Sequence, residues 1–499
     1  MQFILIQILD INMNDFIKIT AEFIQATDDF IWGLPMLVLL LGIGIFLTVK
    51  LHLLQVFHLP DAIKLLFTPH KDHHSKKGDV TSFAALCTAL AATIGTGNIV
   101  GVATAVGIGG PGALFWMFVA AFFGMATKYA ECLLAVRFRE QDKRGHFVGG
   151  PMFYIKNGIG GNYPKIARTL AVFFAVSGIV AGCLGIGTYT QINSVVEAAN
   201  QLNLDRLLVT VIITILTVII TYGGLKSISY TAKKVVPLMG IVYIVACLLI
   251  ILMNIGKVPE AISLIINSAF TPTPAVGGFT GATIMMAMQK GVARGIFSNE
   301  AGLGSAPIAA ASAKTNSPAE QGLISMTGTF IDTIIICMLT GLTLVITGAW
   351  TLDQTGVAMT TLAFKGVLGE QIGLYVVNIC LILFAFTTII GWNFYSERCV
   401  IFLFGVKGIK PFRIIYCLLV ASYILIVLFV DMNNIAEKTA INTIWTVADI
   451  ANGLMAFPNL IALFMLRKVI IEETRKLFSG KGKKGNSYQE VLKQTELTV

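Results

Sequence analysis

The sequence predicts an all-α polytopic membrane protein built from two inverted five-helix repeats, each with a broken first helix, and one extra N-terminal span. Three observations lead to this fold class: an apolar composition, long apolar segments that recur along the chain, and two polar, glycine-containing interruptions five segments apart. The 499 residues are 56% hydrophobic and only 13% charged, with a mean hydropathy of +0.79. Because a soluble protein of this length would carry about a quarter charged residues, the composition indicates an integral membrane protein.

Eleven segments are apolar over roughly the 20 residues that are needed to cross the hydrocarbon core of a bilayer. They cover residues 32–51, 81–108, 111–136, 167–198, 207–222, 235–253, 281–313, 322–347, 372–394, 412–430 and 441–466. Most of the 36 lysine and arginine residues fall on one side of these segments. Since cytoplasmic loops are enriched in these cations, the sequence predicts a plasma-membrane protein with its N-terminus outside and its C-terminus in the cytoplasm. The net charge of +9 follows from this topology and gives no support for nucleic-acid binding.

The first interruption is "GTGN", residues 95–98, inside the second apolar segment. In lipid each unsatisfied backbone group costs several kcal/mol, so irregular backbone persists only where it lines a buried or water-filled cavity. The stretch is therefore a candidate break in the helix, whose opened ends would present N–H groups to anions and carbonyls to cations. The alternative is that Gly97 and Gly101 form a GxxxG packing seam between two close helices.

The second interruption is "FSNEAGLG" in the seventh segment, five segments after the first. An odd number of spans between equivalent segments inverts their topology, and paired interruptions of this kind point to the binding site of a transporter. The predicted organisation is then an external surface segment at 1–30, an extra span at 31–51, five-helix repeats at 80–255 and 281–466, and a basic cytoplasmic tail at 467–499.

Three stretches also resemble the signature segments of a known family. "ALCTALAATIGTGNIVGVATAV", "GGPMFYI" and "GIFSNEAGLGSAP" are similar to those of the alanine or glycine:cation symporters, the sodium:alanine symporter family, and the resemblance extends from about residue 32 to residue 476. It implies the inverted-repeat amino-acid transporter fold, uptake of a small neutral amino acid (alanine or glycine), and a co-transported sodium ion in place of a resident cofactor. The oligomeric state stays open, since one chain is sufficient in principle for transport.

An amino-acid zwitterion at the membrane midplane needs donors for its carboxylate and acceptors for its ammonium group. The amides of Thr96, Gly97 and Asn98 at the first break are expected to bind the carboxylate, helped by the positive end of a half-helix. Carbonyls near Thr93 and Phe297, at opened helix ends, are expected to bind the ammonium group.

Further substrate contacts are expected on three other residues. Gln191 offers a neutral amide in the fourth segment, with interhelical hydrogen bonding as the alternative role, and the family pattern carries it over as a substrate contact. Ser298 lies in the second break. Trp392 is expected, with Phe297, to form a wall sized for a small side chain, because it shares a helical face with Thr388 beside a polar "TT" pair.

The expected sodium site combines hydroxyls with backbone carbonyls. Thr387 and Thr388 supply hydroxyls in the middle of the ninth segment, although their common role would be hydrogen bonding to carbonyls of their own helix. The fold that the family resemblance implies places the ion between this helix and the broken second span, so the carbonyls of Ala91 and Ile94 complete the set.

Charged residues within the segments leave a second mechanism open. A proton-coupled transporter would use Glu131, Asp332 or Asp449 as its relay. Lys128 and Glu131 are three residues apart and are expected to pair with each other. Arg294 and Glu300 flank the second interruption and are expected to form a gate or a brace across it.

A channel is less favoured, because two internal breaks point to one occluded site. A membrane enzyme is less favoured because the sequence carries no HExxH, GxSxG or P-loop motif.

Overall fold

The computed structural model describes residues 18–67, 77–277, 279–429 and 435–479. Residues 1–17 of the predicted N-terminal segment and 480–499 of the predicted tail lie outside the described residues. The described part of the N-terminal segment is helical and continues into the first span over Lys18–Lys50, with a short interruption at Gly33 before α2. The segment is therefore joined directly to this span.

The described chain is almost entirely helical, with one two-stranded antiparallel hairpin. The elements that precede the first repeat are α2 (Leu34–Lys50), α3 (Leu54–Phe57) and α4 (Leu59–Phe67). The first predicted repeat contains α5 (Ser82–Thr93), η1 (Gly97–Gly101), α6 (Val102–Gly109), α7 (Gly112–Arg137), β1 (Glu140–Gln141), β2 (Phe147–Val148), α8 (Pro151–Tyr154), η2 (Ile155–Ile159), α9 (Pro164–Leu184), α10 (Tyr189–Gln201), α11 (Arg206–Tyr222) and α12 (Gly224–Met253).

Two short elements, η3 (Ile255–Lys257) and α13 (Val258–Phe270), connect the repeats. The second predicted repeat contains α14 (Ile284–Asn299), α15 (Pro307–Ala310), α16 (Pro318–Thr329), η4 (Phe330–Cys337), α17 (Met338–Thr347), η5 (Ala349–Thr351), α18 (Gly356–Leu368), α19 (Glu370–Phe404), η6 (Val406–Gly408), α20 (Ile409–Phe429) and α21 (Ile435–Met465). A final amphipathic helix, α22 (Arg467–Ser479), follows.

Each of the eleven predicted segments coincides with a helix or with an interrupted pair of helices. Among the described residues, seven helices are long and apolar enough to cross a membrane, and two bent pairs raise this number to nine. The other two predicted segments are the 17-residue helix α11 and the interrupted pair α14 and α15. Helices α13 and α18 had not been predicted, because each is only 13 residues long.

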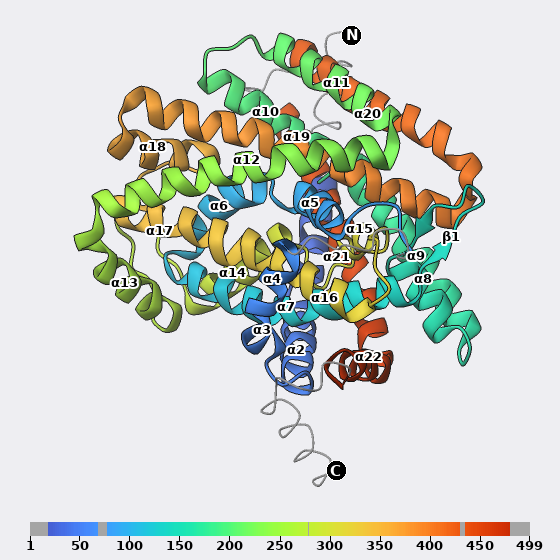
Figure 1. Cartoon of the computed structure of the whole chain (residues 1–499). Coiled ribbons are helices and arrows are strands. Elements are labelled where there is room, and N and C mark those ends of the chain that lie inside the picture. The colour runs from blue at the N-terminus through green and yellow to red at the C-terminus, as the bar shows by residue number, and fades with distance from the viewer. Residues whose placement is uncertain (1–17, 68–76, 278, 430–434, 480–499) are drawn as a thin grey trace.

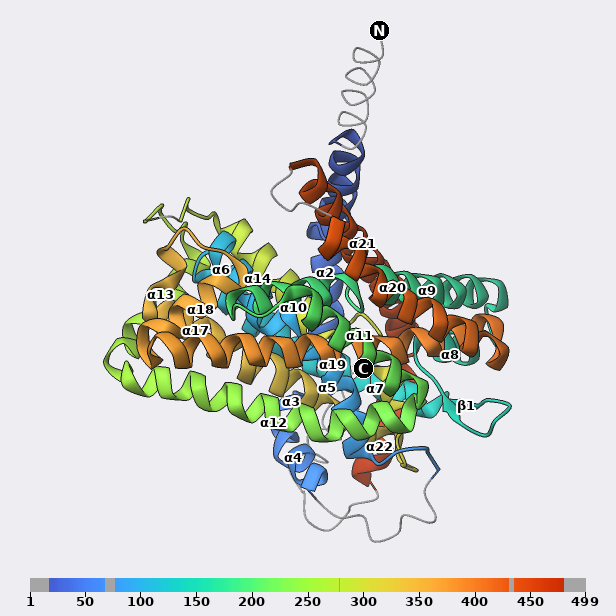
Figure 2. The same ribbon diagram turned by 90° about the horizontal axis from the view of Figure 1, so that it is seen from above.

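The bundle is organised around helices that come from distant parts of the sequence. Helix α7 packs against α14 and α16, and α19 packs against α5, α9, α10 and α12 (Figure 1). The long helix α12 lies along the outside of the bundle (Figure 2) and exposes a row of apolar side chains: Leu238, Ile241, Val242, Val245, Leu248, Leu249 and Leu252. Exposed apolar side chains in such number need an apolar solvent, which agrees with a surface that contacts lipid.

Candidate functional site

The first predicted break is present in the second span. Helix α5 ends at Thr93, Ile94 leaves the helical conformation with a ψ of 93°, and a π-helical turn begins at Gly97. The two halves of the span are bent by 54°. The structure thus confirms a helix break here, starting one residue before the "GTGN" stretch.

The break leaves backbone groups without their helical partners. The amide of Gly95, which would bond to the carbonyl of Ala91 in a continuous helix, donates to Asn98 Oδ1 at 2.9 Å. As a result, the carbonyls of residues 91–94 receive no hydrogen bond from the backbone of the break. The amides of Thr96 and Gly97 likewise donate to no acceptor in the described chain. All these residues are buried, and buried backbone groups without partners are costly, so the break is suited to ligands of both charges.

The backbone amide of Asn98 was expected to bind the substrate carboxylate, but in the structure it already has an acceptor. Its own amide donates to the carbonyl of Gly95 at 3.3 Å, so this amide is not available for a substrate carboxylate. Its side chain is fully buried and holds the break open through Gly95. Of the three amides expected to bind the carboxylate, those of Thr96 and Gly97 remain available.

The second predicted break is also present. Helix α14 ends at Asn299, Glu300 takes a left-handed conformation with φ of 56°, and regular helix resumes only at Pro307. The amide of Ala301 donates to Asn299 Oδ1 at 2.9 Å, which leaves the carbonyl of Phe297 without its usual helical donor. Sequence analysis located this interruption correctly.

The two breaks touch, and glycines at the contact leave the room for this close approach. A Cβ atom built on Gly97 would lie 3.2 Å from Cα of Ser298, and one built on Gly95 would lie 2.5 Å from Thr388 Oγ1. The same atom on Gly95 would lie 3.6 Å from Gln191 Oε1. The fold therefore brings the first break together with Ser298, Gln191 and Thr388, all of which were expected at the site.

Both threonines of α19 are buried and both hydroxyls donate to the carbonyl of Phe384 at 3.0 Å. Their oxygen lone pairs stay available as acceptors after this donation. Thr388 faces Gly95, whereas Thr387 lies 3.7 Å from Sδ of Met239 on α12. Helix α19 also packs closely against the opened end of α5 at Gly391. A Cβ built on Gly391 would lie 2.8 Å from the amide nitrogen of Ala92.

The fourth span carries an interruption that sequence analysis missed. Helix α9 ends at Leu184 and α10 begins at Tyr189, directly before Gln191. Gln191 Nε2 donates to the carbonyl of Ile186 at 3.0 Å, while its buried Oε1 has no partner in the described chain. The glycines in "GCLGIGTYT" were the available signal, but a glycine pair in a span is also typical of helix packing.

Trp392 and Phe297 have different surroundings. Trp392 is fully buried, and its Cβ would be 2.7 Å from a Cβ built on Gly187, beside the α9–α10 interruption. Phe297 is partly buried under the guanidinium group of Arg294, 5.5 Å from its ring centre. It also lines a pocket of about 310 Å³ together with Asp28, Asp29, Trp32, Gln289, Lys290, Ala293, Arg294 and Asp449.

A buried acid that the sequence suggested only as a proton relay, Asp332, joins the two breaks. It lies in the π-helical segment η4 and is fully buried. Its carboxylate accepts hydrogen bonds from Asn98 Nδ2 at 2.8 Å, from Ser298 Oγ at 2.9 Å and from Thr333 Oγ1 at 2.7 Å. Among the described residues no lysine, arginine or histidine forms an ion pair with it. The signal in the sequence was an acid in the otherwise apolar run "TFIDTIIIC".

Two predicted charge pairs are wrong. Arg294 lies 3.8 Å from Asp449 Oδ2, and Glu300 instead accepts a hydrogen bond from Ser305 Oγ at 2.6 Å. Glu131 Oε1 accepts from the amide of Gly302 at 3.0 Å and from Asn459 Nδ2 at 2.5 Å, while Nζ of Lys128 is buried without a hydrogen bond in the described chain. For Glu131 the reason is the second break, whose freed Gly302 amide takes this carboxylate as its acceptor, whereas Arg294 and Glu300 each have a nearer side-chain partner.

Two interrupted helices that meet in the membrane, with buried backbone groups of both signs, define the class of secondary transporters. The chain belongs to the sodium:alanine symporter family, whose model matches residues 17–492. It is therefore a multi-pass membrane protein of a family of sodium-coupled amino-acid symporters.

Known proteins agree with this assignment. The sodium/alanine symporter AgcS of Methanococcus maripaludis is 45% identical, over 91% of this chain and 96% of its own. The probable sodium/glutamine symporter GlnT of Bacillus subtilis is 34% identical, over 95% of each chain. Among solved structures, MhsT in complex with L-phenylalanine matches with a TM-score of 0.52 and 15% identity, over 80% of this chain and 93% of that one. The last likeness concerns the fold alone and confirms the predicted inverted-repeat transporter fold.

Proposed function

We propose that this protein couples the entry of sodium to the uptake of a small neutral amino acid, alanine or glycine, by alternating access. The observation that carries the proposal is the first break, where unpaired carbonyls of residues 91–94 and unpaired amides of Thr96 and Gly97 are buried within a few residues of one another. A cation and a carboxylate would satisfy both sets at once, so each ligand stabilises the conformation that binds the other.

The sodium ion is assigned to the carbonyls of Ala91 and Ile94 and to the hydroxyls of Thr387 and Thr388. The contact between Gly95 and Thr388 supports this assignment, because it sets a hydroxyl oxygen against the opened helix end. Neutral oxygen ligands suit a monovalent ion, since they add no surplus charge.

The amino acid is assigned to the space between the two breaks and Gln191. The amides of Thr96 and Gly97 bind its carboxylate, and the carbonyls of Thr93 and Phe297 bind its ammonium group. Gln191 supports this placement with a buried Oε1 that has no partner in the described chain and lies beside the break. Trp392 and Phe297 bound the space available for the side chain.

Purified protein in liposomes separates sodium coupling from proton coupling. We expect alanine to accumulate under an inward sodium gradient alone and not under an inward proton gradient alone, because the opened carbonyl end of α5 is suited to a metal cation. Glycine, glutamine and leucine uptake in the same liposomes tests the small pocket, for which leucine should be the poorest substrate. Accumulation driven by a proton gradient alone would contradict sodium coupling and would favour a proton relay through a buried carboxylate.

Replacement of Thr388 by alanine tests the sodium site. We expect the sodium concentration that half-saturates alanine binding to rise about tenfold, because one oxygen ligand is lost and 1.4 kcal/mol corresponds to a factor of ten. Thr387→Ala should act in the same direction. The matched control is Thr217→Ala on α11, a buried threonine that also donates to a carbonyl of its own helix, at 2.8 Å, and lies away from the break. An unchanged sodium midpoint in both α19 variants would remove these threonines from the site.

A further inference from the structure

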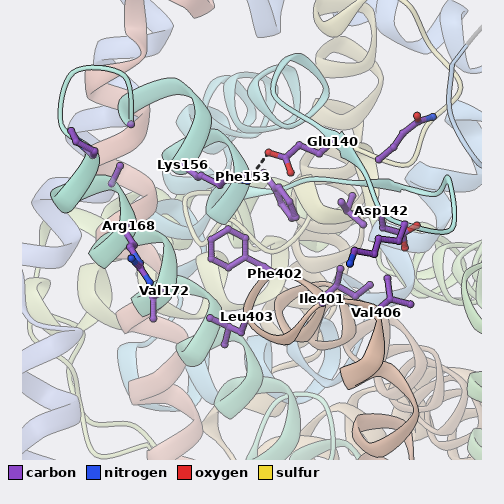
Figure 3. Close-up of a pocket in the computed structure, with 17 residues that line it drawn as sticks. Glu140, Asp142, Phe153, Lys156, Arg168, Val172, Ile401, Phe402, Leu403 and Val406 are labelled. Atoms are coloured by element: carbon purple, nitrogen blue, oxygen red, sulfur yellow. Dashed lines mark hydrogen bonds and ion pairs between the residues drawn. The ribbon is translucent and has the colours of Figure 1, made fainter.

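A second cavity lies away from the helix breaks, at the end of the bundle where lysine and arginine are concentrated. It has a volume of about 620 Å³ and lies between the β1–β2 hairpin, the segment from α8 to α9, and the end of α19 (Figure 3). This volume is within the range of small-molecule sites, which is about 300–1,000 Å³. None of the residues that line it belongs to the proposed transport site.

The floor and walls of this cavity are apolar. The rings of Phe153 and Phe402 meet edge to face with centroids 5.3 Å apart, and Figure 3 shows both in the middle of the cavity. Ile401 and Leu403 of α19 line one side, and Val172 of α9 lines the other. An apolar interior of this size is suited to hydrocarbon.

The rim is charged, and its two acids are already compensated. Glu140 pairs with Lys156 at 2.8 Å, and Asp142 pairs with Arg144 at 2.8 Å. Burial would raise the pKa of Glu140, but hydrogen bonds from Lys156 and Asn157 outweigh it and hold that pKa below its usual value.

The cations Lys143 and Arg168 also line the cavity, and within the described residues neither forms an ion pair. Both side chains are exposed. The rim therefore presents two uncompensated positive charges above an apolar interior.

Helix α9 shows the same change from charge to hydrocarbon along its length. Arg168, Val172 and Val176 are four residues apart and so follow one face of the helix. Val172 is 38% exposed and Val176 is 46% exposed, so a large part of each side chain is left uncovered by protein. In a membrane this face would hold a headgroup beside Arg168 and an acyl chain along the two valines.

We infer that this cavity binds one anionic phospholipid, with its headgroup at the rim that carries Lys143 and Arg168 and an acyl chain against Phe402, Leu403 and Val172. Charge complementarity and the apolar interior together select this ligand. Basic pockets at the cytoplasmic ends of membrane helices recognise anionic headgroups in this way. The site holds the hairpin, α9 and α19 together, so an occupying lipid stabilises the end of the helix that carries Thr388.

Native mass spectrometry of the purified full chain tests the inference. The protein is titrated with dioleoyl phosphatidylglycerol and with dioleoyl phosphatidylcholine, which share acyl chains and differ in headgroup charge. We expect one phosphatidylglycerol to bind at least tenfold more tightly than phosphatidylcholine. The double variant K143Q/R168Q should weaken this binding about 30-fold, since each cation near a headgroup contributes about a factor of five.

Two further variants separate the site from general lipid attraction. The control K165Q/K234Q removes two exposed cations that do not line the cavity, one of them three residues from Arg168, and should leave the binding unchanged. V172W fills the apolar part without changing charge and should weaken lipid binding at least fivefold. Equal binding of the two lipids, or an equal loss in the control, would overturn the inference. Full displacement of phosphatidylglycerol by soluble glycerol phosphate would also overturn it, because the site would then recognise the phosphate group without the acyl chain.

Discussion

Asp332→Asn is expected to lower sodium-driven alanine uptake at least about 100-fold. The carboxylate accepts three hydrogen bonds, from Asn98, Ser298 and Thr333, and so connects both helix breaks. An asparagine replaces one acceptor oxygen by an NH₂ donor, which would face another donor in a fully buried position. A lost hydrogen bond to a charged group costs about 1.5–3 kcal/mol, and two of them exceed a factor of 100. The measurement is the initial rate of uptake into liposomes, normalised to inserted protein.

Controls separate this effect from a failure to fold. Asp353→Asn changes an exposed acid and should transport normally. Ser298→Ala removes a single donor while keeping the charge, and we expect a smaller loss of about tenfold. Near-normal uptake by Asp332→Asn would show that the carboxylate does not couple the two breaks.

Arg139→Gln is expected to loosen the end of the bundle where the first broken span begins and the second one finishes. Its guanidinium donates to the carbonyls of Lys77, Ala311, Ala313 and Thr315 at 2.7–2.9 Å. These carbonyls belong to the chain before α5 and to the chain after α15, which also pair directly through a bridge between Val80 and Ala313. Removing most of these bonds should lower the local opening free energy by about 2 kcal/mol.

Hydrogen–deuterium exchange measures this opening. We expect peptides that cover residues 77–82 and 311–317 to exchange about 30-fold faster in the variant, with little change in α20. The matched control is Arg137→Gln, which removes a neighbouring arginine that pairs with Glu473 of α22 at 3.4 Å and makes no contact with these carbonyls. If the two peptides exchanged at the rate of the unchanged protein, the hydrogen bonds of Arg139 would not be what holds residues 77–82 and 311–317 together.

The two helix breaks could be predicted from the sequence because the surrounding solvent is lipid. Lipid cannot hydrogen-bond to backbone, so polar residues and glycines inside an apolar run are rare and informative. "GTGN" and "FSNEAGLG" therefore marked both breaks to within a few residues. The same argument could not find the interruption before Gln191, because its glycines are equally typical of close helix packing.

The hydrogen-bond partners of the charged residues could not be predicted in the same way. Spacing along one helix suggested a pair of Lys128 with Glu131, and the positions of Arg294 and Glu300 on either side of the second interruption suggested a gate or a brace across it. In the structure, Glu131 instead binds Gly302 and Asn459, which are far from it in the sequence. A broken helix creates orphaned backbone groups, and one of these, the amide of Gly302, competes with the local Lys128 for the Glu131 carboxylate.

The sequence by itself determined the class of protein, the eleven apolar segments and the position of the paired breaks, because each follows from local composition in a solvent that tolerates no unpaired backbone. Only the tertiary structure decided which groups face each other at the breaks. Asp332 reaches Asn98 and Ser298, and Thr388 reaches Gly95, through contacts between helices that are between 34 and nearly 300 residues apart in the sequence. Such contacts depend on close approach at single glycines, where an added Cβ of one residue would collide with another helix, and helical periodicity carries no information about that distance.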